Sequence, residues 1–154
     1  MEEVMGIYKN MNKICTSIEQ SKKLIELGID VNSADMHWQY IEEDNGQLQW
    51  FHFPKDFSIN ENESILVWSL TALLELLPSE FTTENEFGKY KYEIKIRKYK
   101  LTDDVSLYQI AYGNHKLCEN GNCSWKDMIN TGEKEDLLDA VFQMVCWLKE
   151  NGKI

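Results

Sequence analysis

The longest apolar run in the chain, ESILVWSLTALLELLPSEF, extends from residue 63 to residue 81. Its leucines at positions 70, 73, 74 and 77 recur with the spacing i, i+3, i+4, i+7, and Leu66 extends the stripe by one turn. This period predicts a helix with one buried face. The run therefore predicts a central core helix, around which the rest of the chain must fold.

The ends of this helix have recognisable signals. Ser69 can cap a helix that begins at Leu70, and Ser64 or Asn62 would cap a longer one. Pro78 predicts its end, because proline lacks the backbone donor and clashes with the preceding turn.

Two further helices are predicted near the ends of the chain. Residues 16–27 begin with a capping box of Thr16 and Glu19, and Gly28 follows as the C-terminal glycine. The other helix ends at Asn151-Gly152, and Thr131 is its possible cap. Its apolar stripe consists of Leu137, Leu138, Val141, Met144, Val145 and Leu148.

Residues 36–53, MHWQYIEEDNGQLQWFHF, predict a hairpin that turns at Asn45-Gly46. A two-residue turn there sets the register, with Trp38 opposite Phe53, Tyr40 opposite Phe51 and Ile41 opposite Trp50. One face then has Trp38, Tyr40, Phe51 and Phe53, and the other has Gln39, Ile41, Leu48, Trp50 and His52. Large apolar groups on both faces mean that both are covered or that one is a contact surface.

The segment KYKYEIKIRKYK alternates strictly, with Tyr90, Tyr92, Ile94 and Ile96 on one face, and predicts a half-buried strand.

Polar loops are predicted at 54–63 and 79–88. Residues 102–104 read as a turn into an antiparallel partner at 105–112. Asn120-Gly121 predicts a second tight hairpin that places Cys118 opposite Cys123, and residues 125–129 read as a short helix.

These elements predict an α+β fold, because hairpins make the sheet antiparallel and no βαβ pattern is present. We expect a sheet of four or five strands with the central and C-terminal helices packed on one face. The 154 residues form one domain, 1–154, within which residues 1–14 are loosely ordered.

The net charge of −10 disfavours a general nucleic-acid binder, which needs basic surface to displace counterions. The N-terminus is acidic and lacks the apolar region of a leader, and no apolar run is long enough to cross a membrane. We therefore expect a cytoplasmic protein without a membrane partner. Its four cysteines are then reduced thiols.

Catalytic and metal motifs are weak. The chain lacks a G-x-S-x-G nucleophile elbow, a glycine-rich phosphate loop and an H-E-x-x-H helix, so no catalytic residue and no cofactor is predicted. His115, Cys118 and Cys123 supply three potential zinc ligands, but the usual second Cys/His pair is missing. The alternative is that the two cysteines are free thiols that face each other across a hairpin.

Two surfaces are candidate interaction sites. The aromatic hairpin offers Trp38, Tyr40, Trp50 and His52, which favours a protein-binding module or a homodimer. The basic strand offers Lys89, Lys91, Lys95, Arg97 and Tyr99, which together resemble a single-stranded nucleic-acid surface. The competing interpretations of the strand are an edge protected by lysines, and neutralisation by the acidic residues at 56–63 and 80–86.

Two segments carry a family resemblance: SADMHW, with WSLTALLELLP about 30 residues later, and the C-terminal DLLDAVFQMVCWLKENGKI. Together they resemble small uncharacterised proteins of phages and integrated mobile elements of gut anaerobes, over most of residues 16–152. The resemblance implies a cytoplasmic accessory protein of a prophage-like or mobile element. It implies no activity and no catalytic residue.

Overall fold

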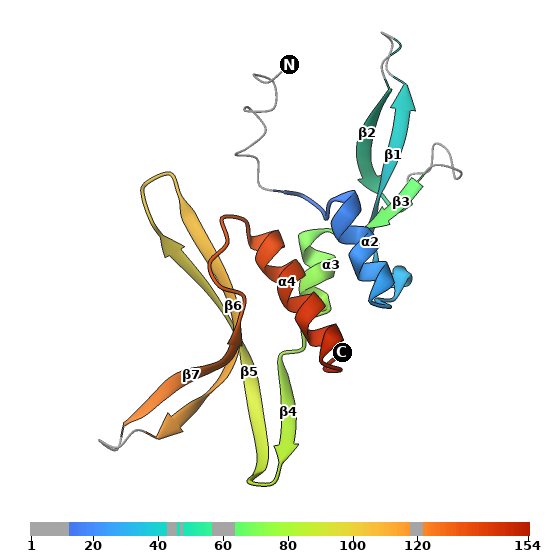
Figure 1. Cartoon of the computed structure of the whole chain (residues 1–154). Helices are drawn as coiled ribbons and strands as arrows, with labels where there is room; N and C mark the ends of the chain where they lie inside the picture. Colours follow the sequence, from blue (N-terminus) through green and yellow to red (C-terminus); the bar gives the residue numbers. More distant parts are fainter. Residues whose placement is uncertain (1–12, 43–45, 47, 57–63, 118–121) are drawn as a thin grey trace.

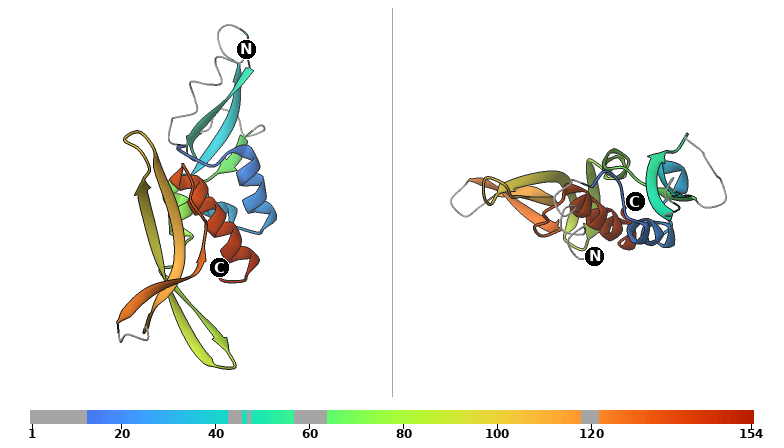
Figure 2. Two further views of the ribbon diagram at one scale, coloured as in Figure 1. Left: turned by 60° about the vertical axis from the view of Figure 1, so that its left-hand side comes forward. Right: turned by 90° about the horizontal axis from the view of Figure 1, so that it is seen from above.

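The computed structural model describes residues 13–42, 46, 48–56, 64–117 and 122–154 (Figure 1). Among the described elements, two antiparallel sheets lie at opposite ends of the molecule and three α-helices lie between them (Figures 1 and 2). The elements in chain order are α2 Ile18–Glu26, the 3₁₀ turn η2 Val31–Ser33, β1 Met36–Glu42, β2 Leu48–Pro54, β3 Ser64–Val67, α3 Leu70–Glu75, β4 Glu80–Asn85, β5 Gly88–Lys100, β6 Ser106–Leu117, β7 Cys123–Asn130 and α4 Leu137–Glu150.

The predicted α+β fold is confirmed. A four-stranded sheet has the order β4-β5-β6-β7, and the central and C-terminal helices, α3 and α4, pack on one face of it. The core between these layers is made mainly by aliphatic side chains of the helices, together with Ile110 and Tyr112 of β6. The buried Tyr112 hydroxyl donates to the Pro78 carbonyl at 2.6 Å, which ties the sheet to the end of the α3 segment.

The four-stranded sheet differs from the prediction at both of its outer strands. Residues 79–88 are not a polar loop, because β4 pairs with β5 and buries Phe81 opposite Tyr92. Residues 125–129 are not a helix but belong to β7, which pairs with β6. Between them β5 alternates as predicted, and Ile94 and Ile96 lie opposite Tyr112 and Ile110.

The apolar run at 63–81 divides into a strand and a short helix. β3 pairs with β1 and places Leu66 opposite His37, so Leu66 does not extend the helical stripe. Ser69 caps α3 as predicted, by accepting the backbone N–H of Ala72 at 3.2 Å. The division follows from Trp68, whose backbone N–H and C=O both bond to Thr16 in an extended segment.

The predicted N-terminal caps of α2 and α4 are wrong, because other residues cap these helices. The box at α2 is formed by Ser17 and Gln20, whose side chains accept each other's backbone N–H at 3.1 and 3.0 Å. Thr16, the predicted cap, is fully buried and bonds to Ser21 and Trp68 instead. At α4 the cap is Asp136 and not Thr131, whose hydroxyl accepts the N–H of Ile110.

The C-terminal signals are confirmed. Gly28, after the cap of α2, has φ +78°, and Gly152, after the cap of α4, has φ +61°, the left-handed conformation that glycine adopts without strain. The expectation for residues 1–14 falls mostly on residues 1–12, outside the described part. None of the helices in the described part is long and apolar enough to span a membrane.

Candidate interaction surfaces

The register of the first hairpin differs from the prediction by one residue. β1 and β2 pair with Trp38 opposite His52, Tyr40 opposite Trp50 and Glu42 opposite Leu48. This register is incompatible with a two-residue turn at Asn45-Gly46, which would place Ile41 opposite Trp50; residues 43–45 and 47 themselves lie outside the described residues. Because side chains alternate along a strand, a shift of one residue moves each β2 side chain to the opposite face relative to β1.

This shift brings the four predicted hairpin residues to one face. Residues directly opposite in an antiparallel pair share a face, so Trp38 and His52 lie beside Tyr40 and Trp50. The Trp38 and His52 rings meet edge to face, with their centroids 5.2 Å apart. Trp50 is 40% exposed and His52 is also exposed. The resulting surface, the positions of Trp38, Tyr40, Trp50 and His52, is called the Trp-His face below.

The opposite face of the hairpin is the more buried one. His37 and Gln39 are buried there, and the His37 ring lies 5.9 Å from the ring of Phe53. The prediction that Phe51 and Phe53 share a face with Trp38 is therefore wrong. On the Trp-His face, the Trp38 Nε1–H donates to the Thr16 carbonyl at 3.0 Å, which anchors the β1 side of this face. Its residues described as exposed, Trp50 and His52, lie on β2, the outer strand of the order β2-β1-β3.

The basic strand forms part of the outer face of the four-stranded sheet. Tyr92 and Ile94 of β5 pack towards the core, so the alternate residues point away from it. These are the predicted residues Lys89, Lys91, Lys95, Arg97 and Tyr99. Register adds His115 and Trp125 from β6 and β7 to the same face. The sequence analysis missed Trp125 because it assigned a short helix to residues 125–129, whereas the structure pairs them with β6.

Three cations of this outer face, Lys91, Lys95 and Arg97, have partners within the sheet. The Arg97 guanidinium donates to both carboxylate oxygens of Asp127, at 2.7 and 2.6 Å. These bonds lower the pKa of Asp127 to about 2. Burial of the carboxylate acts in the opposite direction, and a further hydrogen bond from Trp125 also lowers the pKa. Lys91 forms an ion pair with Glu80, and the Lys95 ammonium lies 5.0 Å from the centroid of the Trp125 ring.

A charge that is already paired gains little from a phosphate, since a nucleic acid would have to displace its carboxylate. Lys89 also lies opposite Glu84 in the register of β4 and β5. The contacts of the outer face therefore support neutralisation of the basic strand by nearby acidic residues more than they support nucleic-acid binding. These acidic residues include Glu80 and Glu84 of the predicted 80–86 segment.

The predicted metal ligands are only partly described. Cys123 pairs with Leu117 and not with Cys118, which lies outside the described residues. The ring of His115 lies edge-on to Trp125, with the ring centroids 5.5 Å apart. Within the described part of the chain, no three His, Cys, Asp or Glu side chains lie close enough together to hold a metal ion.

The described cysteines are free thiols in different environments. Burial raises the pKa of both Cys15 and Cys146 to about 11, so both thiols are protonated and poorly nucleophilic at neutral pH. Cys123 is exposed near the end of the β6–β7 hairpin.

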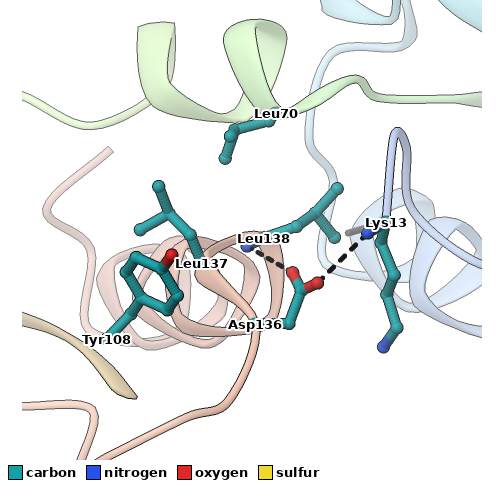
Figure 3. A pocket seen from close by; sticks show the side chains of 6 residues that line it. All are labelled: Lys13, Leu70, Tyr108, Asp136, Leu137 and Leu138. Atoms are coloured by element: carbon teal, nitrogen blue, oxygen red, sulfur yellow. Dashed lines mark hydrogen bonds between the residues drawn. The ribbon is translucent and has the colours of Figure 1, made fainter. Parts of the chain in front are cut away.

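A cavity of about 120 Å³ lies where α3 and α4 begin (Figure 3). It is lined by Lys13, Leu70, Tyr108, Asp136, Leu137 and Leu138. Asp136 is occupied as the cap of α4, because it accepts the backbone N–H groups of Leu138 at 2.8 Å and Lys13 at 3.1 Å. Ligand sites are commonly about 300–1,000 Å³, so this cavity suits a few water molecules better than a substrate.

Comparisons with protein-family models, curated proteins and solved structures found no match to the chain. The candidate surfaces therefore rest on geometry. On the Trp-His face Trp50 is 40% exposed and His52 is also exposed, whereas on the outer face Arg97 and Lys91 are paired with carboxylates and Tyr99, which is 41% exposed, donates to Gln109.

Proposed function

We propose that the chain is a non-enzymatic protein-binding module that contacts its partner through the Trp-His face. The observation that carries this proposal is the register of the hairpin, which puts the positions of Trp38, Tyr40, Trp50 and His52 on one face, where Trp50 is 40% exposed and the Trp38 ring contacts His52. Trp and Tyr are enriched among the residues that dominate binding energy, because they bury a large apolar area with little loss of side-chain freedom.

Two further points support this function. Trp38 is held by its bond to Thr16, and its ring contacts His52, so this part of the surface is organised before a partner binds. The cavity is small for a substrate, and the sequence has no catalytic motif. A role as an accessory protein of a prophage-like or mobile element is part of the proposal and rests on the sequence resemblance alone.

The test is a pull-down with the tagged chain from a lysate of a gut anaerobic bacterium, treated with nuclease. We expect a specific protein that the wild type retains and that Trp50→Ala/His52→Ala loses. Phe87→Ala is the matched control, since Phe87 is a 79% exposed aromatic at the tip of the β4–β5 hairpin. A partner that is retained by the Trp50/His52 variant, or that disappears with nuclease, would count against the proposal.

A further inference from the structure

The outer strand of the three-stranded sheet has a sequence without charged residues. β2, LQWFHFP, has no Asp, Glu, Lys or Arg, and its pairing with β1 runs without a register shift from Leu48 to Pro54. Natural sheets protect their edges with charges, bulges, prolines or very short strands, because an edge exposes unpaired backbone groups. In β2 the only such device is Pro54, at its last position.

The other three outer strands of the two sheets are protected. β4 has Glu80 and Glu84, and β7 has Lys126 and Asp127 next to a bulge in its pairing with β6. β3 has only four residues. Among the described strands, β2 is thus the outer strand best suited to pair with another chain.

The negative charge of the molecule limits which surface can contact a second copy of the chain. With a net charge of −10, two copies repel each other over most of their surfaces. An uncharged strand on a hairpin that projects from the helical body is where two copies can approach with the least repulsion (Figures 1 and 2).

We propose that β2 pairs antiparallel with β2 of a second copy, about a two-fold axis at Phe51. The two sheets then join into one of six strands, in the order β3-β1-β2-β2-β1-β3. This inference rests on the proposed function, because it names a second copy as the partner of the same surface. An isologous contact of this kind is self-complementary by symmetry.

The register about Phe51 is favoured by the side chains. It places Trp50 directly opposite His52 of the partner subunit, and residues opposite each other share a face. The structure already contains this cross-strand pair in the monomer, where Trp38 and His52 make an edge-to-face contact at 5.2 Å. The contact would extend the Trp-His face across the dimer, and each His52 ring would lie between two tryptophans.

The first experiment measures the mass of the wild-type protein in solution by light scattering and sedimentation over a wide range of concentration. We expect a concentration-dependent shift from 18.1 kDa towards twice that mass. A mass that stays at 18.1 kDa up to the highest attainable concentration would overturn the inference.

The second experiment tests the register with two variants, Trp50→Lys/His52→Lys and Trp50→Glu/His52→Glu. Each variant alone places like charges opposite each other across the axis and is expected to be monomeric. An equimolar mixture places lysine opposite glutamate and is expected to form a 1:1 heterodimer, detected by native mass spectrometry. Phe87→Lys, a charge on an exposed aromatic away from β2, should leave the wild-type dimer intact.

The outcomes separate this inference from the proposed function. A dimer that persists in both charged variants, or folded variants that stay monomeric when mixed, would overturn β2 pairing. Circular dichroism tests whether the variants are folded. If they are not folded, the mass of the wild-type protein in solution alone decides whether the inference stands. A monomeric wild type that still captures another protein through Trp50 and His52 would refute the inference and leave the proposed function standing.

Discussion

Single side chains join the two segments of the sequence that carry the resemblance. The Trp68 indole N–H donates to the Ser33 hydroxyl at 2.8 Å, and Asp35 accepts the backbone N–H of Ser69 at 2.8 Å and its hydroxyl at 2.5 Å. Trp68 is fully buried, so the hydrogen bond satisfies a donor that would otherwise lose its water. In these contacts SADMHW and WSL hold the start of β1 against the start of α3, which is a structural role.

A pH-dependent contribution to stability is expected from Asp127. Folding lowers its pKa from about 3.9 in the unfolded chain to about 2, chiefly through Arg97. The ion pair therefore stabilises the fold fully above the unfolded-state pKa and loses its contribution as the pH falls towards 2. We expect Asp127→Asn to lower the free energy of unfolding by about 1–2 kcal/mol at neutral pH, with the difference shrinking below about pH 4. Urea unfolding across this range measures it, and a constant difference would contradict it.

The close approach at Gly113 leads to a second prediction at this scale. A Cβ atom there would meet the backbone oxygen of Lys126 and lie 2.9 Å from the Trp125 ring, at a bulge between β6 and β7. Because the backbone oxygen cannot move aside easily, Gly113→Ala should lower the free energy of unfolding by about 1–3 kcal/mol. Denaturant unfolding tests this, with Thr82→Ala, at an exposed position of β4, as the control. Equal effects of the two changes would contradict the proposed clash.

Among the elements, those with a long unbroken period agree best with the prediction. The 14 residues of α4 bury Leu138, Val141, Met144, Val145 and Leu148 of the predicted stripe, and β5 alternates over 13 residues. Short elements were missed, because a few residues hold too little periodicity to outweigh their tertiary contacts. β3 formed from an apparently helical run because Ile65 and Val67 found partners on β1.

The start of α2 yields a prediction that distinguishes the observed cap from the predicted one. Ser17→Ala removes the capping hydroxyl and should cost about 1 kcal/mol. Thr16→Val should cost at least as much, about 1–3 kcal/mol, because the buried Trp68 N–H loses its acceptor. Thermal or denaturant unfolding measures both. Glu19→Ala, at the predicted box partner, should have the smallest effect, and a larger loss there than at Ser17 would argue for the box at Thr16.

At the level of the whole molecule, the two sheets use their surfaces differently. The inner face of the four-stranded sheet packs against helices, and on its outer face side chains of different strands engage one another, among them Arg97 with Asp127 and Lys95 with Trp125. The three-stranded sheet leaves Trp50 and His52 exposed at its outer strand. This difference is why the interaction proposals concern the hairpin.

The paired charges of the outer face lead to a prediction for the intact protein. We expect fluorescence anisotropy to show no binding of a labelled single-stranded oligonucleotide at low salt, because Lys91 and Arg97 are paired with carboxylates and the net charge is −10. Lys91→Glu/Lys95→Glu should behave as the wild type does. Salt-sensitive binding that this variant abolishes would instead support the nucleic-acid alternative.

Local signals in the sequence determined the fold class, the helix stops at Gly28 and Gly152, the cap at Ser69 and the choice of the hairpin as a candidate surface. They rest on periodicity and on turn or cap chemistry, which act over a few residues. The strand registers, the split of the apolar run and the pairing of Arg97 with Asp127 were decided by tertiary structure. Each depends on which distant segments meet, and a shift of one residue costs little locally but reverses every side chain of a strand. The Trp-His face exists because of such a shift.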